Sequence, residues 1–218
     1  MLTQPYSWQF IRPLPWTRED TDMDDGQPGT PNTPRGTVSV IGRGDLSADS
    51  PLVPLCEALG RLICDRGYVL VSGGRGGVMA AACRGARSSS SWWHGATVGI
   101  LPGHDPADAN PWVDVALPTG LDVGRNAVVA HSDCVIAIGG GAGTLSEIAL
   151  AWQLLRPVIA FRVDGWSGRL AGTRLDDRVR QPHLEDDQIY GVDTPEEALD
   201  LVEELRRSYT HRHPGIGR

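Results

Sequence analysis

A regular alternation of short apolar runs and helical patterns, which begins at Thr37, is the feature that most constrains the fold of this chain. Most of the runs show little polar alternation, which is typical of strands buried on both faces of a sheet. The runs lie at 37–41, 68–72, 97–101, 113–117, 134–138, 157–161 and 189–192. We therefore predict an α/β fold, a single doubly wound (Rossmann-like) domain with a mostly parallel sheet of about seven strands.

Capping and stop residues mark the helices between these strands. Ser50 is a good N-cap and Gly67 a good stop for a helix that begins near Pro51. Further helices are expected after the glycines at 73–77, at about 122–131 with Asp122 as cap, at 144–155 with Thr144 as cap, and at 195–207 with Thr194 as cap. The segment that joins 97–101 to 113–117 leaves no room for a helix, so this connection is the exception.

The N-terminal residues differ in composition from the rest of the chain. Residues 1–35 are rich in Pro, Thr, Asp and Gly and show no periodicity, so they cannot bury enough apolar surface to fold alone. We predict an irregular N-terminal arm over 1–35, a Rossmann-like domain over 36–208 and a polar C-terminal tail over 209–218. The aromatic residues of the arm, which are candidates to hold it against the domain or a partner subunit, are Tyr6, Trp8, Phe10 and Trp16.

Composition and charge narrow the class of protein. The formal net charge of −7 disfavours a nucleic-acid partner but leaves room for a small anionic ligand at a locally positive site. The four cysteines form no C-x-x-C pair, so we expect buried, reduced thiols and a cytoplasmic protein. The N-terminus lacks a signal-peptide pattern, and no apolar stretch reaches the roughly 20 residues of a membrane helix, so we expect no membrane partner.

Two glycine-rich loops follow predicted strands, "SGGRGGVM" at 72–79 and "GGGAGT" at 139–144. Ligands of doubly wound sheets bind beyond the carboxyl ends of the strands, where each loop opens a helix whose first amides suit a phosphate group. Neither loop is a Walker A motif, because no Gly-Lys-Ser/Thr follows. We predict phosphate or nucleotide contacts from Gly73, Gly74, Arg75, Gly76, Gly77, Gly140, Gly141, Gly143 and Thr144, and further ligand contacts from Gly42, Arg43, Met79 and Asn126.

Glu147 and Arg125 each allow two interpretations. The stretch from Thr144 to Glu147 fits a capping box, in which the glutamate bonds the backbone amide of the threonine; alternatively, the carboxylate takes part in chemistry. Arg125 either pairs with Asp122 on its own helix, or supplies a cation for a phosphate or for charge on a leaving group. The six histidines show no ligand spacing, so we expect no metal site.

The order of these motifs resembles a known superfamily. From about Gly36 to Leu205, "SGGRGGVM", "GILPG", "GRN" and "GGGAGTLSE" follow one another as in the LOG (LONELY GUY) superfamily, long labelled possible lysine decarboxylases. "GGGAGTLSE" is similar to its P-G-G-x-G-T-x-x-E signature. The resemblance implies a nucleoside 5′-monophosphate phosphoribohydrolase with Arg125 and Glu147 as the catalytic pair and the glycine loops as the phosphate site. It also implies a homodimer or larger homo-oligomer.

Departures from the LOG signature point to one branch of the superfamily. Gly139 stands where the signature has proline, Asn126 where active LOG enzymes have lysine, and Ala142 where they often have an aromatic residue. In these features the chain looks more like the molybdenum cofactor carrier proteins, which bind a phosphate-bearing pterin.

The resemblance leaves two functions open. We expect a binding protein for a phosphorylated small molecule, a nucleotide or the molybdenum cofactor held as cargo, with no cofactor required. The alternative is a hydrolase that cuts the N-glycosidic bond of nucleoside 5′-monophosphates with Arg125 and Glu147. A lysine decarboxylase is disfavoured, because no lysine is placed to form a Schiff base with pyridoxal phosphate.

Overall fold

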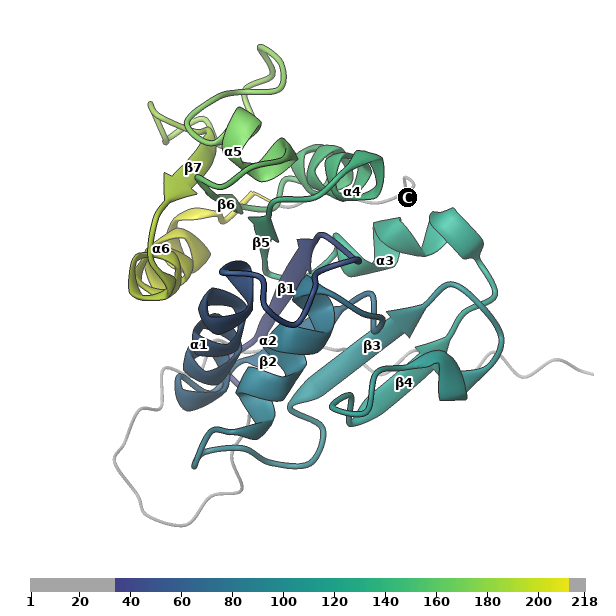
Figure 1. Cartoon of the computed structure of the whole chain (residues 1–218). Helices are drawn as coiled ribbons and strands as arrows, with labels where there is room; N and C mark the ends of the chain where they lie inside the picture. The colour runs from purple at the N-terminus through teal and green to yellow at the C-terminus, as the bar shows by residue number, and fades with distance from the viewer. Residues whose placement is uncertain (1–33, 212–218) are drawn as a thin grey trace, which may run out of the picture. The chain divides into compact units, whose positions relative to one another are not determined.

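The computed structural model describes residues 34–211, which form a parallel sheet with helices on both faces (Figure 1). The strands are β1 (Thr37–Gly42), β2 (Val69–Ser72), β3 (Thr97–Leu101), β4 (Val115–Pro118), β5 (Cys134–Ile138), β6 (Val158–Phe161) and β7 (Ile189–Val192). The helices are α1 (Leu52–Asp65), α2 (Val78–Arg87), α3 (Asn126–Val129), α4 (Ala142–Gln153), α5 (Trp166–Leu170) and α6 (Pro195–Ser208), with 3-10 helices η1 (Pro106–Asp108) and η2 (Asp122–Arg125). The predicted α/β class is confirmed. The arm predicted over 1–35, with its aromatic residues, lies outside the described residues except for its last two positions.

The strand order creates a crevice at the centre of the sheet. All seven strands are parallel and are ordered β4-β3-β2-β1-β5-β6-β7. The chain runs outward from β1 to β4 and then resumes on the other side of β1 with β5. In doubly wound folds this reversal opens a crevice at the carboxyl ends of the two central strands, where ligands bind.

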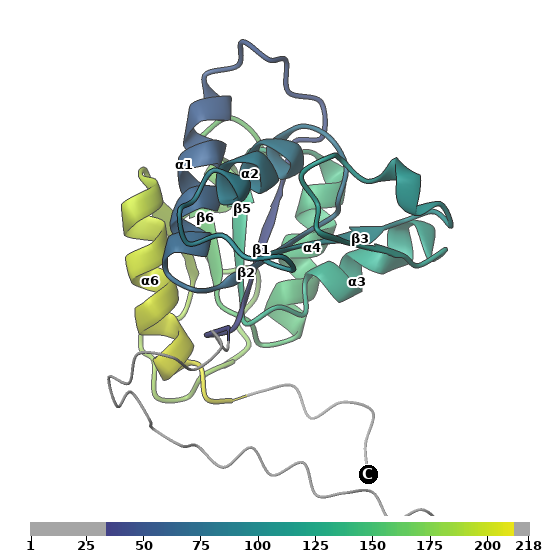
Figure 2. The same ribbon diagram turned by 90° about the horizontal axis from the view of Figure 1, so that it is seen from below.

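Alternate residues of the central strands divide the core into two layers. Val38 and Val40 of β1 pack in a cluster with residues of α1, α2 and α6, whereas Ile41 packs in a second cluster with residues of α3 and α4. Figure 2 shows α1, α2 and α6 on one side of the sheet and α3 and α4 on the other. Both faces of the strands are therefore apolar, which explains the lack of polar alternation in the sequence.

The crossing of α1 and α2 depends on two glycines. A Cβ at Gly60 would lie 1.9 Å from the carbonyl oxygen of Ala82, and one at Gly85 would lie 2.0 Å from that of Glu57. A larger residue at either position would push the helices apart. This close contact fixes α2, whose first turn carries Met79 to the end of the sheet where the crevice lies.

Two helix starts differ from the prediction. Helix α4 begins at Ala142 with Gly141 as its N-cap, so Thr144 lies inside the helix and its side chain does not cap it. Asp122 has a φ of 48°, in the left-handed region, whereas an N-cap residue usually has extended backbone angles. Residues 122–125 accordingly form the 3-10 helix η2, and α3 covers only the following turn.

The packed domain continues past Ser208, beyond which the sequence predicts a polar tail. Tyr209 is 1% exposed and belongs to the core. The amide of His211 donates to Oε1 of Gln181 at 3.0 Å, and Nε2 of Gln181 donates to the carbonyl oxygen of His211 at 2.8 Å. Within the described residues, the end of the predicted tail is thus tied to the connection between α5 and β7.

That connection also contains a buried ion pair. The side chains of Arg180 and Asp187 are 0% and 3% exposed. Arg180 donates from Nε to Asp187 at 3.0 Å, from Nη2 to the hydroxyl of Tyr209 at 3.0 Å and from Nη1 to the carbonyl oxygen of Arg156 at 3.0 Å. Its guanidinium carbon lies 3.4 Å from the ring centre of Trp152 in α4. The pair joins α4, the α5–β7 connection and the end of the domain.

Two expectations drawn from composition concern the described part of the chain. Every cysteine lies within it, and all four are buried without forming a disulfide, as predicted. No helix between residues 34 and 211 has the length and apolar character required to cross a membrane.

Candidate functional site

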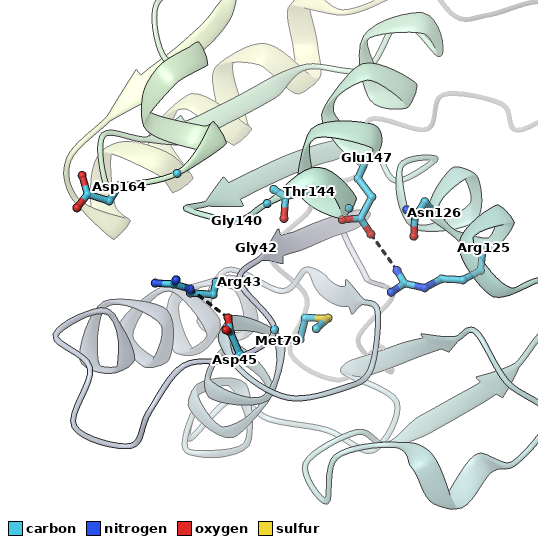
Figure 3. Close-up of a pocket in the computed structure, with 14 residues that line it drawn as sticks. Gly42, Arg43, Asp45, Met79, Arg125, Asn126, Gly140, Thr144, Glu147 and Asp164 are labelled. Carbon is cyan, nitrogen blue, oxygen red and sulfur yellow. Dashed lines mark hydrogen bonds and ion pairs between the residues drawn. The ribbon is translucent and has the colours of Figure 1, made fainter.

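A pocket of about 520 Å³ lies beyond the carboxyl ends of β1 and β5 (Figure 3). The parallel register of these strands places Gly42 beside Ile138, so the loop after β1 and the glycine loop after β5 start next to each other. The loop after β6 completes the wall. The lining residues are Gly42, Arg43, Gly44, Asp45, Met79, Arg125, Asn126, Gly140, Gly141, Gly143, Thr144, Glu147, Asp164 and Gly165.

The glycine loop brings the N-terminus of α4 to this pocket. Gly139 and Gly140 have φ values of 62° and 88°, which a residue with a side chain rarely adopts. A Cβ at Gly140 would also lie 2.1 Å from Oγ1 of Thr144. The loop therefore needs glycine to turn directly into the helix, whose first amides lack intrahelical partners and lie at the positive end of the helix dipole.

Glu147 pairs with Arg125 across the pocket. Nη1 of Arg125 donates to Oε1 of Glu147 at 2.9 Å, and the two side chains are 13% and 9% exposed. The capping-box interpretation is therefore wrong: because α4 starts two residues before Thr144, its glutamate lies one turn too far along the helix to cap it. Burial raises the pKa of Glu147 to about 7, although Arg125 opposes the shift.

Arg125 lies at the junction of η2 and α3, with Glu147 rather than Asp122 as its partner. A Cβ at Gly73 would lie 2.6 Å from Nη2 of Arg125, so the first glycine loop makes room for the guanidinium. Nε of Arg125 is buried and has no hydrogen-bond partner among the described residues. This N–H would become available to a ligand only if the side chain of Arg125 moved, since the atom itself is not exposed in the pocket.

The first glycine loop packs against its neighbours. A Cβ at Gly74 would lie 2.8 Å from Cδ2 of Leu101, and one at Gly77 would lie 2.1 Å from the carbonyl oxygen of Arg43. Close packing thus accounts for several of its glycines. The pocket lining does not include the predicted phosphate ligands Gly73, Gly74, Arg75, Gly76 and Gly77, and their role stays a prediction.

The remaining predicted ligand contacts come together in the pocket. Asn126 is 9% exposed, and its Nδ2 donates to Oγ of Ser146 at 2.8 Å, while that hydroxyl donates to the carbonyl oxygen of Gly143 at 2.7 Å. This chain of hydrogen bonds holds α3 against the first turn of α4. Arg43 pairs with Asp45 at 3.1 Å, on the opposite side of the pocket from Arg125 (Figure 3).

Sequence reasoning missed part of the lining. Gly44 and Asp45 continue the loop after β1, and Asp164 and Gly165 follow β6. The rule that ligands bind beyond the carboxyl ends of strands would have indicated both loops, because each directly follows a predicted strand. Within residues 34–211, no group of three or more His, Cys, Asp or Glu side chains is arranged to hold a metal ion.

The fold and the site together define a class, an α/β protein with a pocket at the switch point of a parallel sheet and a glycine-rich helix start in its wall. The chain belongs to the SLOG cluster4 family, whose model matches residues 35–199. This membership confirms the predicted relationship to the LOG superfamily. Solved structures that are similar to this chain include molybdenum cofactor binding and carrier proteins, which places the chain near that branch of the superfamily.

Three solved structures are similar to this chain. The X-ray structure of TM1055 is 35% identical, with a TM-score of 0.67, and the match covers 77% of this chain and 98% of that one. The molybdenum cofactor binding protein from Rippkaea orientalis is 35% identical, with a TM-score of 0.63 and coverage of 78% and 96%. The molybdenum cofactor carrier protein from Chlamydomonas reinhardtii is 26% identical, with a TM-score of 0.62 and coverage of 79% and 98%.

Proposed function

We propose that this chain binds a phosphorylated small molecule, with a nucleotide or the molybdenum cofactor as the candidate ligand. The observation that carries the proposal is that the N-terminus of α4 opens into the same pocket as the side chains of Arg43 and Arg125. Unpaired amides, a helix dipole and guanidinium groups are the groups that proteins use to bind phosphate. The similarity to a molybdenum cofactor binding protein and a molybdenum cofactor carrier protein supports this class of ligand.

The pocket has the size and the mixed character of a small-molecule site. Its volume of about 520 Å³ falls within the usual range for such sites. In the proposed arrangement the phosphate lies at the first turn of α4, and the ring system of the ligand lies toward Met79, whose thioether offers a polarisable apolar surface. A nucleic-acid or membrane partner and a required cofactor are not part of the proposal.

A charge placed at Gly143 tests the phosphate site. A Cβ there would meet no atom within 4 Å, so a short side chain fits without strain. Gly143→Asp should weaken binding of AMP at least about 10-fold relative to Gly143→Asn, because only the aspartate repels the phosphate at this short distance. Isothermal titration with AMP, with adenosine as the ligand without phosphate, provides the measurement.

The comparison of matched variants controls for shape. Asparagine and aspartate have almost the same volume, so obstruction of the pocket affects both. If wild type binds AMP and adenosine equally, or if the two variants bind AMP equally, phosphate recognition at α4 is wrong.

A second candidate function is hydrolysis of nucleoside 5′-monophosphates, and the Arg125–Glu147 pair favours it. The carboxylate is buried in the pocket, and its pKa of about 7 lets it gain or lose a proton near neutral pH. Glu147 would position a water or stabilise positive charge on the ribose while the base leaves, and Arg125 would orient the nucleotide. The sequence contains no lysine, so the chain cannot form a Schiff base with pyridoxal phosphate.

The two functions differ in what happens to the nucleotide. The test is to incubate the protein with AMP and related nucleotides and to measure the free base by chromatography. If the chain is a hydrolase, wild type should release the free base and Glu147→Gln should release none. Tight binding of a phosphorylated pterin without release from any nucleotide would instead support a binding protein alone.

A homo-oligomer and a cytoplasmic location stay predictions. Exposed apolar residues on neighbouring elements support the first of these, since such residues often mark a protein interface. They are Val115, Leu117, Leu121, Val123 and Val128, on β4, η2, α3 and the segment between β4 and η2.

A further inference from the structure

Arg43 stands beside the proposed phosphate site at the start of the loop after β1. Its amide donates to the carbonyl oxygen of Ile138 at 3.4 Å, and its own carbonyl accepts from the amide of Val78 at 2.9 Å. The backbone is thus attached to β5 on one side and to α2 on the other. Because neighbouring strands lie about 4.8 Å apart, the long arginine side chain begins next to the glycine loop that follows β5.

The charges around the pocket do not favour an anion as they stand. The lining contains three carboxylates, Asp45, Glu147 and Asp164, and two guanidinium groups. Both guanidinium groups already have a carboxylate partner. A phosphate that entered the pocket would therefore gain most if one of these ion pairs opened.

The two ion pairs differ greatly in exposure. The side chains of Arg125 and Glu147 are 13% and 9% exposed, so their separation would leave charges in a poorly solvated place. The side chains of Arg43 and Asp45 are 57% and 84% exposed, and such surface pairs contribute little free energy. Arg43 is therefore the cation that a ligand can recruit at low cost.

We propose that Asp45 competes with the ligand for Arg43, and thereby sets the affinity of the pocket for phosphate. While the pocket is empty, the carboxylate holds the guanidinium at its edge. When a phosphate binds at α4, Arg43 leaves Asp45 and donates two N–H groups to the phosphate oxygens, a geometry that guanidinium favours. This inference rests on the proposed function, because it concerns the same phosphate site.

Binding of AMP to four variants at constant ionic strength tests the competition. Asp45→Asn should raise the affinity about 3- to 5-fold, because it frees Arg43. Arg43→Gln should lower it at least about 10-fold, through loss of a charge-assisted contact. Asp164→Asn is the control, because it removes a pocket carboxylate that has no ion-pair partner among residues 34–211; it should raise the affinity less than about 2-fold. When Arg43 is already replaced by glutamine, Asp45→Asn should raise the affinity no more than this control does.

The outcomes separate this inference from the proposed function. The competition is overturned if Asp45→Asn raises the affinity for AMP equally with and without Arg43, or raises it no more than Asp164→Asn does. Either result would show that Asp45 acts only by long-range repulsion of the phosphate. A loss of affinity in Asp45→Asn would also overturn it. If wild type binds AMP no better than adenosine, the proposed function fails and the role of Arg43 fails with it.

Discussion

Replacement of Asp187 by alanine is expected to lower the free energy of unfolding by about 3–5 kcal/mol, the usual cost of removing one partner of a buried ion pair. The variant leaves Arg180 charged, with its side chain 0% exposed. The hydroxyl of Tyr209 and the carbonyl oxygen of Arg156 still accept hydrogen bonds from it, but neither carries a compensating charge. Denaturant unfolding followed by circular dichroism measures the loss.

The exposed pair between Arg162 and Asp193 provides the matched control. These side chains are 50% and 62% exposed, so Asp193→Ala should cost no more than about 1 kcal/mol although it also replaces aspartate by alanine. Adding Arg180→Met to Asp187→Ala should restore part of the stability, because the uncompensated charge is then gone. Equal losses in Asp187→Ala and Asp193→Ala would contradict the buried-pair interpretation.

The stability of wild type relative to Glu147→Gln is expected to decrease by roughly 3 kcal/mol between pH 4.5 and pH 8. Burial raises the pKa of Glu147 from 4.5 to about 7 in the folded protein. Between these values the folded state keeps a proton that the unfolded chain releases, so a rise in pH favours unfolding. The contribution is fully present below the unfolded pKa and is lost as the pH rises through the folded pKa.

Unfolding curves of both proteins at several pH values check this difference. Glu147→Gln also changes the contact with Arg125, but this change alters the free energy of unfolding by an amount that does not follow the titration of Glu147. Glu185→Gln, which alters an exposed glutamate, controls for the loss of a carboxyl group. If the free energies of unfolding of wild type and Glu147→Gln differ by a constant amount across this pH range, burial does not shift the pKa of this carboxyl group.

The two experiments concern groups that contact or belong to different parts of helix α4. Trp152 near the end of α4 lies under the guanidinium of Arg180, and Glu147 lies earlier in the same helix and faces the pocket. Loss of one partner of the buried pair destabilises the scaffold, whereas ionisation of the buried Glu147 is unfavourable at the candidate site. A carboxylate that is unfavourable in the folded protein at neutral pH is typical of a functional position.

Much of the fold could be predicted from local patterns. All seven apolar runs contain strands of the parallel sheet; the central strands are buried on both faces, whereas the edge strand β4 leaves Val115 and Leu117 exposed. The glycines at 139–141 and the residues Arg125 and Glu147 could be chosen because they follow strands or open helices, and the structure brings Arg125 and Glu147 together. Asp45 and Asp164 could have been found by the same rule.

Other features depended on contacts between distant segments. The partner of Glu147 lies 22 positions away on another element, so helix spacing favoured a capping box instead. The glycines at 73–77 resemble a phosphate loop in sequence, yet several of them are required by the proximity of Leu101, Arg43 and Arg125. Nothing in the sequence of the α5–β7 connection indicated that Arg180 is buried.

The sequence by itself determined the alternation of strands and helices, and therefore the end of the sheet where the candidate site had to lie. Hydrophobic periodicity and glycine content act over a few residues, so they can be recognised without the tertiary structure. Only the tertiary structure decided which glycine loop lines the pocket, which carboxylate each arginine contacts, and which charges are buried. The reason is that these depend on strand order, which places β1 beside β5 and thus joins segments about a hundred residues apart in the chain.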